Sequence, residues 1–241
     1  IKTDSVTIIN NKKDEKGYYT GSDGEKYALL NANPCVIDNT TTFSNGKTII
    51  KNKEYYFKVE PIKWKVLKDK NGKAILFSEL ILDAHRFDGI SNNYEVSSIR
   101  SWLNNEFYNK AFTDKEKELI SMKTIDIEKE VKTLLGSKVI SESINDKVFL
   151  LSKEEITNKS YGFSNKKGED DKARCKKVTD YAKANFADEE TKNVWYWLRT
   201  PCASNSSGAC YVYGNGDVHW CDVSFAGAGV APALSFCKAK A

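Results

Sequence analysis

Trp195-Tyr196-Trp197-Leu198-Arg199-Thr200-Pro201 opens the last forty-odd residues of this chain, which contain three short apolar or aromatic runs. The second run is Tyr211–Val218 and the third is Gly229–Leu234. Glycine, asparagine and serine separate the runs, a pattern that predicts strands joined by turns. The segments between them carry side chains of nearly every chemical type. A rigid frame with such mixed side chains favours recognition over catalysis.

The second run predicts a β-hairpin, and its register decides which side chains share a face. A two-residue turn at Asn215-Gly216 would place Val212 opposite His219. A three-residue loop with a glycine bulge at Gly216 would pair Val212 with Val218 instead. The bulged register puts Cys210 and Trp220 on one face, and Tyr211, Tyr213, His219 and Cys221 on the other. A slip of one residue exchanges the faces, so the valine pair favours the bulged loop.

Composition places the chain among folded globular proteins. It has 241 residues, 40% of them hydrophobic and 12% aromatic, which is enough to bury a sizeable core. The net charge is +4, but lysines alternate with acidic residues almost everywhere. Because no basic stripe carries aromatic platforms, the pattern argues against nucleic-acid binding. No apolar run reaches the ~20 residues of a membrane-spanning helix, so we expect no direct membrane insertion.

Outside the C-terminal segment, the patterns alternate between strands and helices. Strands are expected at Tyr27–Leu30, Thr48–Ile50, Tyr55–Val59, Ile62–Leu67, Ala74–Ser78 and Asp146–Leu151. Asn71-Gly72 predicts a hairpin turn. Helices are expected to begin after the caps Ser97 or Ser98, Thr113 (with Glu116 as capping-box partner) and Ser152, and to cover Lys176–Asn185. Strands, a few amphipathic helices and further strands indicate an α+β fold.

The same patterns of turns, strands and helices predict the domain organisation. Residues 1–16 are predicted to form an N-terminal extension or an edge strand, and residues 17–241 a single domain. Within that domain, residues 17–54 form a hairpin-rich lead-in. Residues 195–237 form C-terminal strands with a candidate variable binding face.

Several segments together resemble a known family. They are YYFKVEPIKWKVL (55–67), LILD (80–83), IRSWLNNEFYNKAF (99–112), VFLLS (148–152), YAKAN (181–185) and the WLRTP to GVAPAL ending. They are similar to an uncharacterised bacterial family of secreted and surface proteins, a domain of unknown function. That family is related to the C-type-lectin-like fold of formylglycine-generating enzymes and of variable proteins of diversity-generating retroelements. The resemblance therefore implies an α+β, C-type-lectin-like fold and an extracellular or cell-surface location.

The retroelement relationship implies which C-terminal residues would be a constant frame and which would vary. The frame residues would be Trp197, Leu198, Arg199, Pro201, Tyr211, Val212, Gly216, Val218, Gly229, Val230, Pro232 and Leu234. Mutation of adenines in an Asn codon can produce most of the residue types found between them. Trp220 is not reachable from such a codon and departs from this scheme.

An enzyme on the same fold is the alternative. Formylglycine-generating enzymes use a reactive cysteine pair near this end of the fold, but that pair aligns with no two cysteines here. Metal or cysteine chemistry would require Cys202, Cys210, His219 and Cys221 to converge, and the bulged register separates Cys210 from the others. The calcium-binding motifs of sugar-binding C-type lectins are absent from the sequence. We therefore expect no metal, cofactor or catalytic residue.

Two further polar groups have a functional and a structural interpretation. Arg199 could bind a ligand carboxylate, although a core arginine held by a buried carboxylate or by carbonyls is favoured. Asp83 lies two residues from His85, an acid/base spacing that is more typical of a polar loop after a strand.

The sequence patterns thus predict a non-catalytic binding module whose ligand is a protein or a glycan, and the resemblance implies that it is extracellular and belongs to a larger surface protein. Affinity would come from a few aromatic anchors among small polar groups. The predicted ligand contacts are Ala203, Ser204, Asn205, Ser206, Tyr213, His219, Trp220, Asp222, Ser224 and Phe225.

Overall fold

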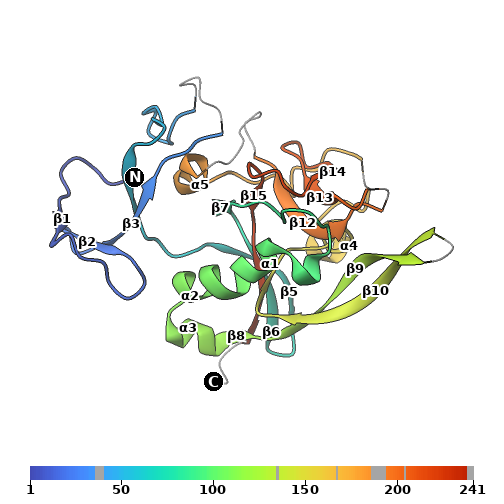
Figure 1. Ribbon diagram of the computed structural model, residues 1–241. Helices are drawn as coiled ribbons and strands as arrows, with labels where there is room; N and C mark the ends of the chain where they lie inside the picture. Colours follow the sequence, from blue (N-terminus) through green and yellow to red (C-terminus); the bar gives the residue numbers. More distant parts are fainter. Residues whose placement is uncertain (36–40, 134–135, 167, 186–193, 204, 238–241) are drawn as a thin grey trace.

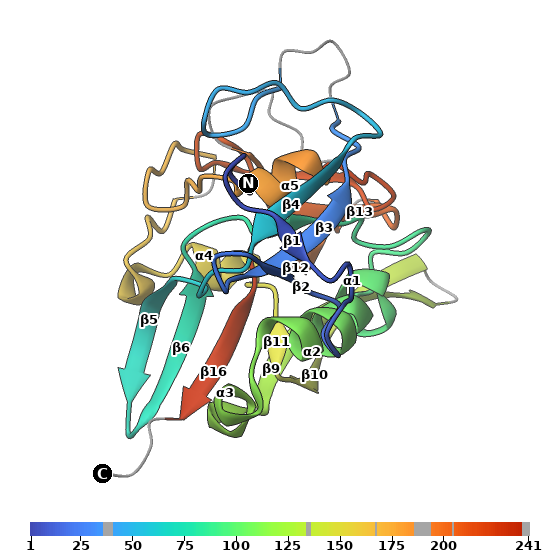
Figure 2. The same ribbon diagram turned by 90° about the vertical axis from the view of Figure 1, so that its left-hand side faces the viewer.

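The computed structural model describes residues 1–35, 41–133, 136–166, 168–185, 194–203 and 205–237. Over these residues the fold is α+β, with mostly antiparallel strands and few helices (Figures 1 and 2). No helix in the described ranges is long and apolar enough to span a bilayer.

The N-terminal residues form a sheet of their own with a small core. Its strand order is β1 (Ile8–Ile9), β2 (Tyr19–Gly21), β3 (Lys26–Asn31) and β4 (Glu54–Lys58). Phe43 packs edge-on against Phe57, which in turn contacts Tyr181 of the helix α5 (Asp180–Ala184). This sheet stands beside the rest of the molecule, with α5 next to it (Figure 1). The expected strand at Thr48–Ile50 is wrong, since Thr48 forms only an isolated bridge with Thr42.

A second sheet joins the middle of the chain to its end. Its order is β11 (Val148–Phe149), β16 (Ala233–Cys237), β6 (Lys73–Ser78) and β5 (Trp64–Lys70), and β8 (Ile120–Ser121) also pairs with β16. Asn71 and Gly72 both have positive φ, +52° and +73°, which confirms the turn between β5 and β6. In Figure 2 the strands β5, β6 and β16 run side by side.

Most helices lie in the middle of the chain, and those with a predicted cap at Ser97, Thr113 or Ser152 begin where that cap predicts. The helices in this part of the chain are η1 (Tyr94–Val96), α1 (Ser98–Trp102), the π-helical turn η2 (Leu103–Phe107), α2 (Tyr108–Ala111) and α3 (Asp114–Leu119), followed later by α4 (Lys153–Ile156) and η3 (Lys159–Tyr161). Ser97 caps α1, and Thr113 with Glu116 forms the capping box of α3. Ser152 and Glu155 form a second capping box. The predicted caps are therefore confirmed.

The final helix is shorter than expected. The predicted range was Lys176–Asn185, but α5 covers Asp180–Ala184. Thr179 caps it by accepting a hydrogen bond from the Ala182 N–H at 3.1 Å. Lys176 lies before this cap, and its side chain is buried beside Ser78 of β6. A tertiary contact therefore removes the first turn from the helix.

A long ribbon between the two halves of the chain was not predicted. β9 (Lys123–Thr133) pairs along its whole length with β10 (Gly136–Asp146), and the ribbon projects away from the helices (Figure 1). Ile125, Ile127 and Ile144 are buried at its base. The charged residues between the isoleucines weakened the strand signal in the sequence.

The third sheet carries the C-terminal segment. Its order is β14 (Val218–Asp222), β13 (Gly208–Val212), β12 (Tyr196–Pro201), β15 (Gly229–Val230) and β7 (Asp83–Ala84). β12 pairs in parallel with β15 and antiparallel with β13. All six residues of β12 are buried, whereas every residue of β14 is exposed or half-buried. The sheet therefore runs from the core to the surface.

Candidate functional site

A ladder of aromatic rings crosses the third sheet from its core to its edge. Trp197 pairs with Tyr211, and Tyr211 pairs with His219. Directly paired residues point to the same face, and the ring centroids lie 6.4 and 6.0 Å apart. Trp197 is fully buried, Tyr211 is half-buried and His219 is exposed. The ladder therefore connects the hydrophobic core to a ring in contact with solvent.

Three further rings widen this ladder. Tyr213 lies 6.3 Å from Tyr211 and 6.0 Å from His219, measured between centroids. Trp195 stacks on Phe225 at 4.8 Å with an interplanar angle of 20°. We call Trp195, Trp197, Tyr211, Tyr213, His219 and Phe225 the aromatic face. Because its rings support one another at contact distance, the face is a rigid apolar platform.

Small polar groups border the aromatic face. The Nε2 atom of His219 lies 2.9 Å from the Asp217 carboxylate. Asp222 accepts hydrogen bonds from the hydroxyl and the N–H of Ser224, at 2.6 and 2.8 Å. The hydroxyl bond lowers the pKa of the exposed Asp222 carboxyl. The border can therefore offer carboxylates and an imidazole to a ligand that covers the rings.

The turn of the β13–β14 hairpin has the bulged form. Val212 pairs with Val218, and Gly216 at φ +92° donates to the Tyr213 carbonyl at 2.8 Å. The Tyr213 N–H donates to the Asp217 carbonyl, also at 2.8 Å. The register predicted from the valine pair is confirmed, and with it the placement of Cys210 and Trp220 on the face opposite His219.

A buried arginine fixes this turn to the rest of the molecule. The guanidinium of Arg174, which has no exposed surface, donates to the carbonyls of Gly216 and Ile156, each at 3.0 Å. It also donates to the carbonyls of Ser164 and Lys166 and lies 3.2 Å from the Asp171 carboxylate. One side chain thus holds three separate loops through their backbones.

A buried asparagine holds the loop that precedes β13. The Nδ2 of Asn92 donates to the carbonyls of Asn205 and Gly208 at 3.0 and 3.1 Å. Asn92 is 4% exposed, and its own N–H donates to the Ser206 carbonyl. Sequence reasoning missed both Asn92 and Arg174, because they lie far along the chain from the loops they bind and no local motif marks them.

The predicted contact residues do not share one environment. Six are exposed: Ala203, Ser206, His219, Trp220, Asp222 and Ser224. Three are half-buried: Asn205, Tyr213 and Phe225. Ser204 lies outside the described residues. The sequence also suggests Tyr211, Tyr213 and His219 as a solvent-facing aromatic set, but Tyr211 and Tyr213 are half-buried and pack against the core. Phe225 packs there too, and His219 is the exposed ring on that side.

The cysteine-rich segment does not assemble a metal site in the described structure. No group of three or more metal-binding side chains converges among the described residues. Cys210 and Cys221 are free thiols on opposite faces of the hairpin. Burial raises the pKa of the Cys210 thiol to about 11, so this thiol is a poor nucleophile at neutral pH.

Arg199 has the structural role that the sequence favoured. Its guanidinium donates to the Leu150 carbonyl at 2.7 Å, to the Asp126 carbonyl at 2.8 Å and to the Glu155 carboxylate at 2.5 Å. Arg199 is 4% exposed. A ligand carboxylate therefore has no route to this charge.

Asp83 and His85 contact different partners and do not form an acid/base pair. Asp83 accepts from the Asn185 amide at 2.7 Å, and burial raises the pKa of its carboxyl to about 6. His85 stacks on Trp102, and its Nδ1 contacts the Arg86 carbonyl at 2.6 Å. Asp83 also lies on a strand, β7, and not in the expected polar loop.

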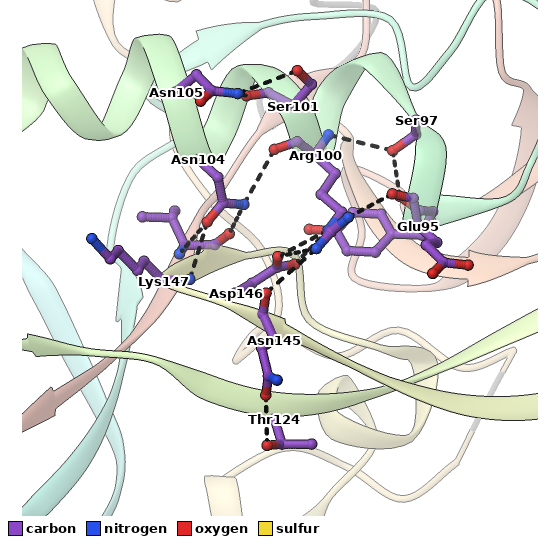
Figure 3. Close-up of polar contacts among 12 residues, drawn as sticks. Glu95, Ser97, Arg100, Ser101, Asn104, Asn105, Thr124, Asn145, Asp146 and Lys147 are labelled. Atoms are coloured by element: carbon purple, nitrogen blue, oxygen red, sulfur yellow. Dashed lines mark hydrogen bonds and ion pairs between the residues drawn. The ribbon is translucent and has the colours of Figure 1, made fainter.

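A polar cluster joins the helices to the β10–β11 connection (Figure 3). Asn104 accepts from the N–H groups of Lys147 and Val148, at 3.0 and 3.2 Å, and donates to the Val148 carbonyl at 2.9 Å. Arg100 forms an ion pair with the nearly buried Asp146 at 2.8 Å. A hollow of about 300 Å³ borders the cluster, but these hydrogen bonds already satisfy its arginine.

The family comparison covers the part of the chain that carries these features. The family described as "Domain of unknown function (DUF6273)" matches residues 71–237, more than half of the chain. The chain belongs to this family. The DUF6273 region begins in the β5–β6 turn and ends with β16, so it includes the aromatic face and leaves out the N-terminal sheet. No curated protein and no solved structure matches the chain.

Proposed function

We propose that this protein is a non-catalytic binding module that recognises a protein or a glycan outside the cell through its C-terminal hairpin. One observation carries the proposal. The aromatic face reaches solvent at His219 beside exposed small residues, on a hairpin held by buried side chains. Preorganised rings with a polar border bind ligands at a small entropic cost, because they lose little freedom on binding.

The finer assignment rests on the motif resemblance. In this proposal the DUF6273 region has a C-type-lectin-like fold, related to formylglycine-generating enzymes and to variable proteins of diversity-generating retroelements. The chain would be a bacterial surface or secreted protein, and diversified codons would fall between the frame residues of the C-terminal segment, from Cys202 to Phe225. The α+β arrangement with a C-terminal hairpin at the surface is compatible with this assignment.

Binding can be tested on glycan and protein arrays probed with the purified chain. The double substitution Tyr213→Ala with His219→Ala removes one half-buried and one exposed ring, and should lower the binding signal at least tenfold. Met122→Ala is the matched control, because Met122 is 57% exposed and lies outside the hairpin. An unchanged signal in the double variant, or no ligand on either array, would contradict the proposal.

The diversification has an independent test in the gene itself. Deep sequencing of the coding region from several cultures should show substitutions concentrated at adenines in the codons between the frame residues of the C-terminal segment, while the frame codons stay constant. A nearby reverse-transcriptase gene with a near-copy of the 3′ end should accompany them. Uniform sequence without these elements would remove the retroelement assignment and leave the binding proposal standing.

A further inference from the structure

The strand β14 ends its sheet with an unpaired edge. It pairs with β13 on one side, and no other described strand pairs with it. The five residues Val218-His219-Trp220-Cys221-Asp222 are exposed or half-buried, and Trp220 is 52% exposed. An apolar ring of this size at a sheet edge is a typical mark of an interaction site.

The hydrogen bonds of the hairpin show which backbone groups point outward. The N–H of Tyr213 donates to the Asp217 carbonyl, and the N–H of Val223 donates to the Ser207 carbonyl, each at 2.8 Å. Antiparallel partners alternate between bonded and non-bonded pairs, so His219 and Cys221 also bond to β13. The backbone groups of Val218, Trp220 and Asp222 therefore face away from β13.

Some of these outward-facing groups already have a hydrogen-bond partner within the chain. The N–H of Val218 donates to the Asp217 carboxylate, and the Asp222 carbonyl accepts from the Phe225 N–H. Between them, the Trp220 N–H and carbonyl are presented to a further strand.

Several of the other outer strands in the sheets of three or more strands carry features known to prevent such pairing. β5 has three lysines, Lys65, Lys68 and Lys70, and an irregular register between Val66 and Lys68. β1 and β7 are two residues long. The edge of β4 is occupied where the Lys2 N–H donates to the Tyr56 carbonyl at 2.7 Å. β14 has no lysine, proline or bulge within it, so it lacks the usual protection of an edge strand.

We propose that β14 pairs antiparallel with β14 of a second copy of this chain, about a two-fold axis at Trp220. This inference goes beyond the proposed function and does not depend on it. In this register Trp220 faces Trp220 of the second copy, and His219 faces Cys221. Val218 then lies opposite Asp222, so no two like charges are opposed. The strand is thus complementary to itself.

The pairing explains the exposure of Trp220 and joins the two sheets into one. In a single chain the indole of Trp220 lies beside Gly208, where an added Cβ would be 3.0 Å from it, and about half of the side chain stays exposed. In the dimer the two indoles would cover each other across the axis. Paired residues point to the same face, so the aromatic faces of both copies would lie on one side of the continuous sheet. The dimer would therefore present two binding faces in one plane.

A strand of five residues buries less area than a standard interface, so the dimer is expected to be weak. Sedimentation equilibrium from about 5 µM to 1 mM should show a reversible monomer–dimer equilibrium. Trp220→Lys places a lysine on the edge and should weaken association at least tenfold. Val66→Lys is the matched control, because Val66 is 56% exposed on the protected edge strand β5. It should leave association unchanged.

A disulfide test checks the register. His219 and Cys221 of the other copy form a non-bonded pair, in which the Cβ atoms are closest. In His219→Cys, oxidation should therefore produce a covalent dimer on non-reducing gels, and His219→Cys with Cys221→Ser should not. Circular dichroism and thermal melting of each variant establish that it is folded. A wild-type chain that stays monomeric at 1 mM would overturn the proposal and leave the edge to a different partner. A dimer that withstands Trp220→Lys, or that fails to cross-link through position 219, would overturn it equally.

Discussion

Lys176 provides the sharpest test of the packing, because its amine is buried without an anionic partner among the described contacts. Lys176 is 7% exposed and its Nζ donates to the Ser78 carbonyl. The ring centroid of Phe77 lies 3.7 Å from the Nζ. Burial, with a smaller effect of the Lys65 charge, lowers the pKa of Lys176 to about 7, whereas the Glu79 carboxylate acts in the opposite direction.

This shift makes the stability of the protein depend on pH in a defined direction. Above pH 7 the folded protein releases the Lys176 proton, while the unfolded chain keeps it until about pH 10.5. The unfolded state therefore binds more protons between these values, and the free energy of unfolding rises with pH across this window. Below pH 7 both states are protonated, and the full cost of the buried charge is present.

The size of the effect follows from the shift and from the nearby ring. A shift of this size corresponds to about 5 kcal/mol. The contact with Phe77 favours the charged amine by up to about 2 kcal/mol, which opposes the shift. We therefore expect the free energy of unfolding to gain about 2 to 4 kcal/mol between pH 6 and pH 10 through Lys176, because one proton changes it by at most about 1.4 kcal/mol per pH unit.

Urea titrations of the wild type and of Lys176→Met at half-unit steps from pH 6 to pH 10 measure this gain. The difference in unfolding free energy between the two proteins should change by the stated amount, because a methionine side chain does not titrate and the contributions of all other groups cancel. Lys177→Met is the matched control, since Lys177 is the exposed neighbour. Parallel pH profiles for the wild type and Lys176→Met would refute the reasoning.

Three further predictions concern single side chains. Asp83→Asn should stabilise the protein at pH 7 by about 1 to 3 kcal/mol and leave its stability unchanged below pH 4. The reason is that the raised pKa of the buried Asp83 carboxyl makes the wild type lose stability as pH rises from about 4 to 6. Thermal melts of both proteins at pH 3.5 and 7 measure the difference. Gly216→Ala should cost more than about 2 kcal/mol in urea unfolding, since an added Cβ would lie 2.0 Å from a backbone oxygen of the anchoring loop. Gly72→Ala, with a similar φ and open space, should cost about 1 kcal/mol, and equal costs would contradict the clash. Asn104→Ala should cost about 2 to 4 kcal/mol and speed amide exchange at residues 147 and 148, whereas Asn105→Ala should do neither; equal exchange rates would show that the amide is dispensable.

Local patterns in the sequence predicted the elements that depend on local interactions. The glycine bulge of the β13–β14 hairpin followed from pairing Val212 with Val218. The caps at Ser97, Thr113 and Ser152 followed from side chains that bond to backbone within three residues. Such interactions are decided by neighbours in the chain, so an isolated sequence is enough to find them.

The candidate site was only partly predictable, because its burial depends on interactions that are not local in the chain. The sequence indicated that the C-terminal hairpin carries chemically mixed side chains. The sequence did not indicate how much of Tyr211 and Phe225 would be buried against Trp195 and the neighbouring core. Burial depends on the elements packed against a residue, and several of these, such as β7 and β15, come from distant parts of the chain.

The sequence by itself determined the α+β class, the hairpin register and the starts of the capped helices. Only the tertiary structure decided that Arg174 and Asn92 hold the loops of the hairpin, that Lys176 lies in the core, and that β14 ends its sheet unpaired among the described strands. The physical reason is that these features join residues separated by tens of positions. Their energies depend on burial and on backbone groups that meet only after the chain has folded.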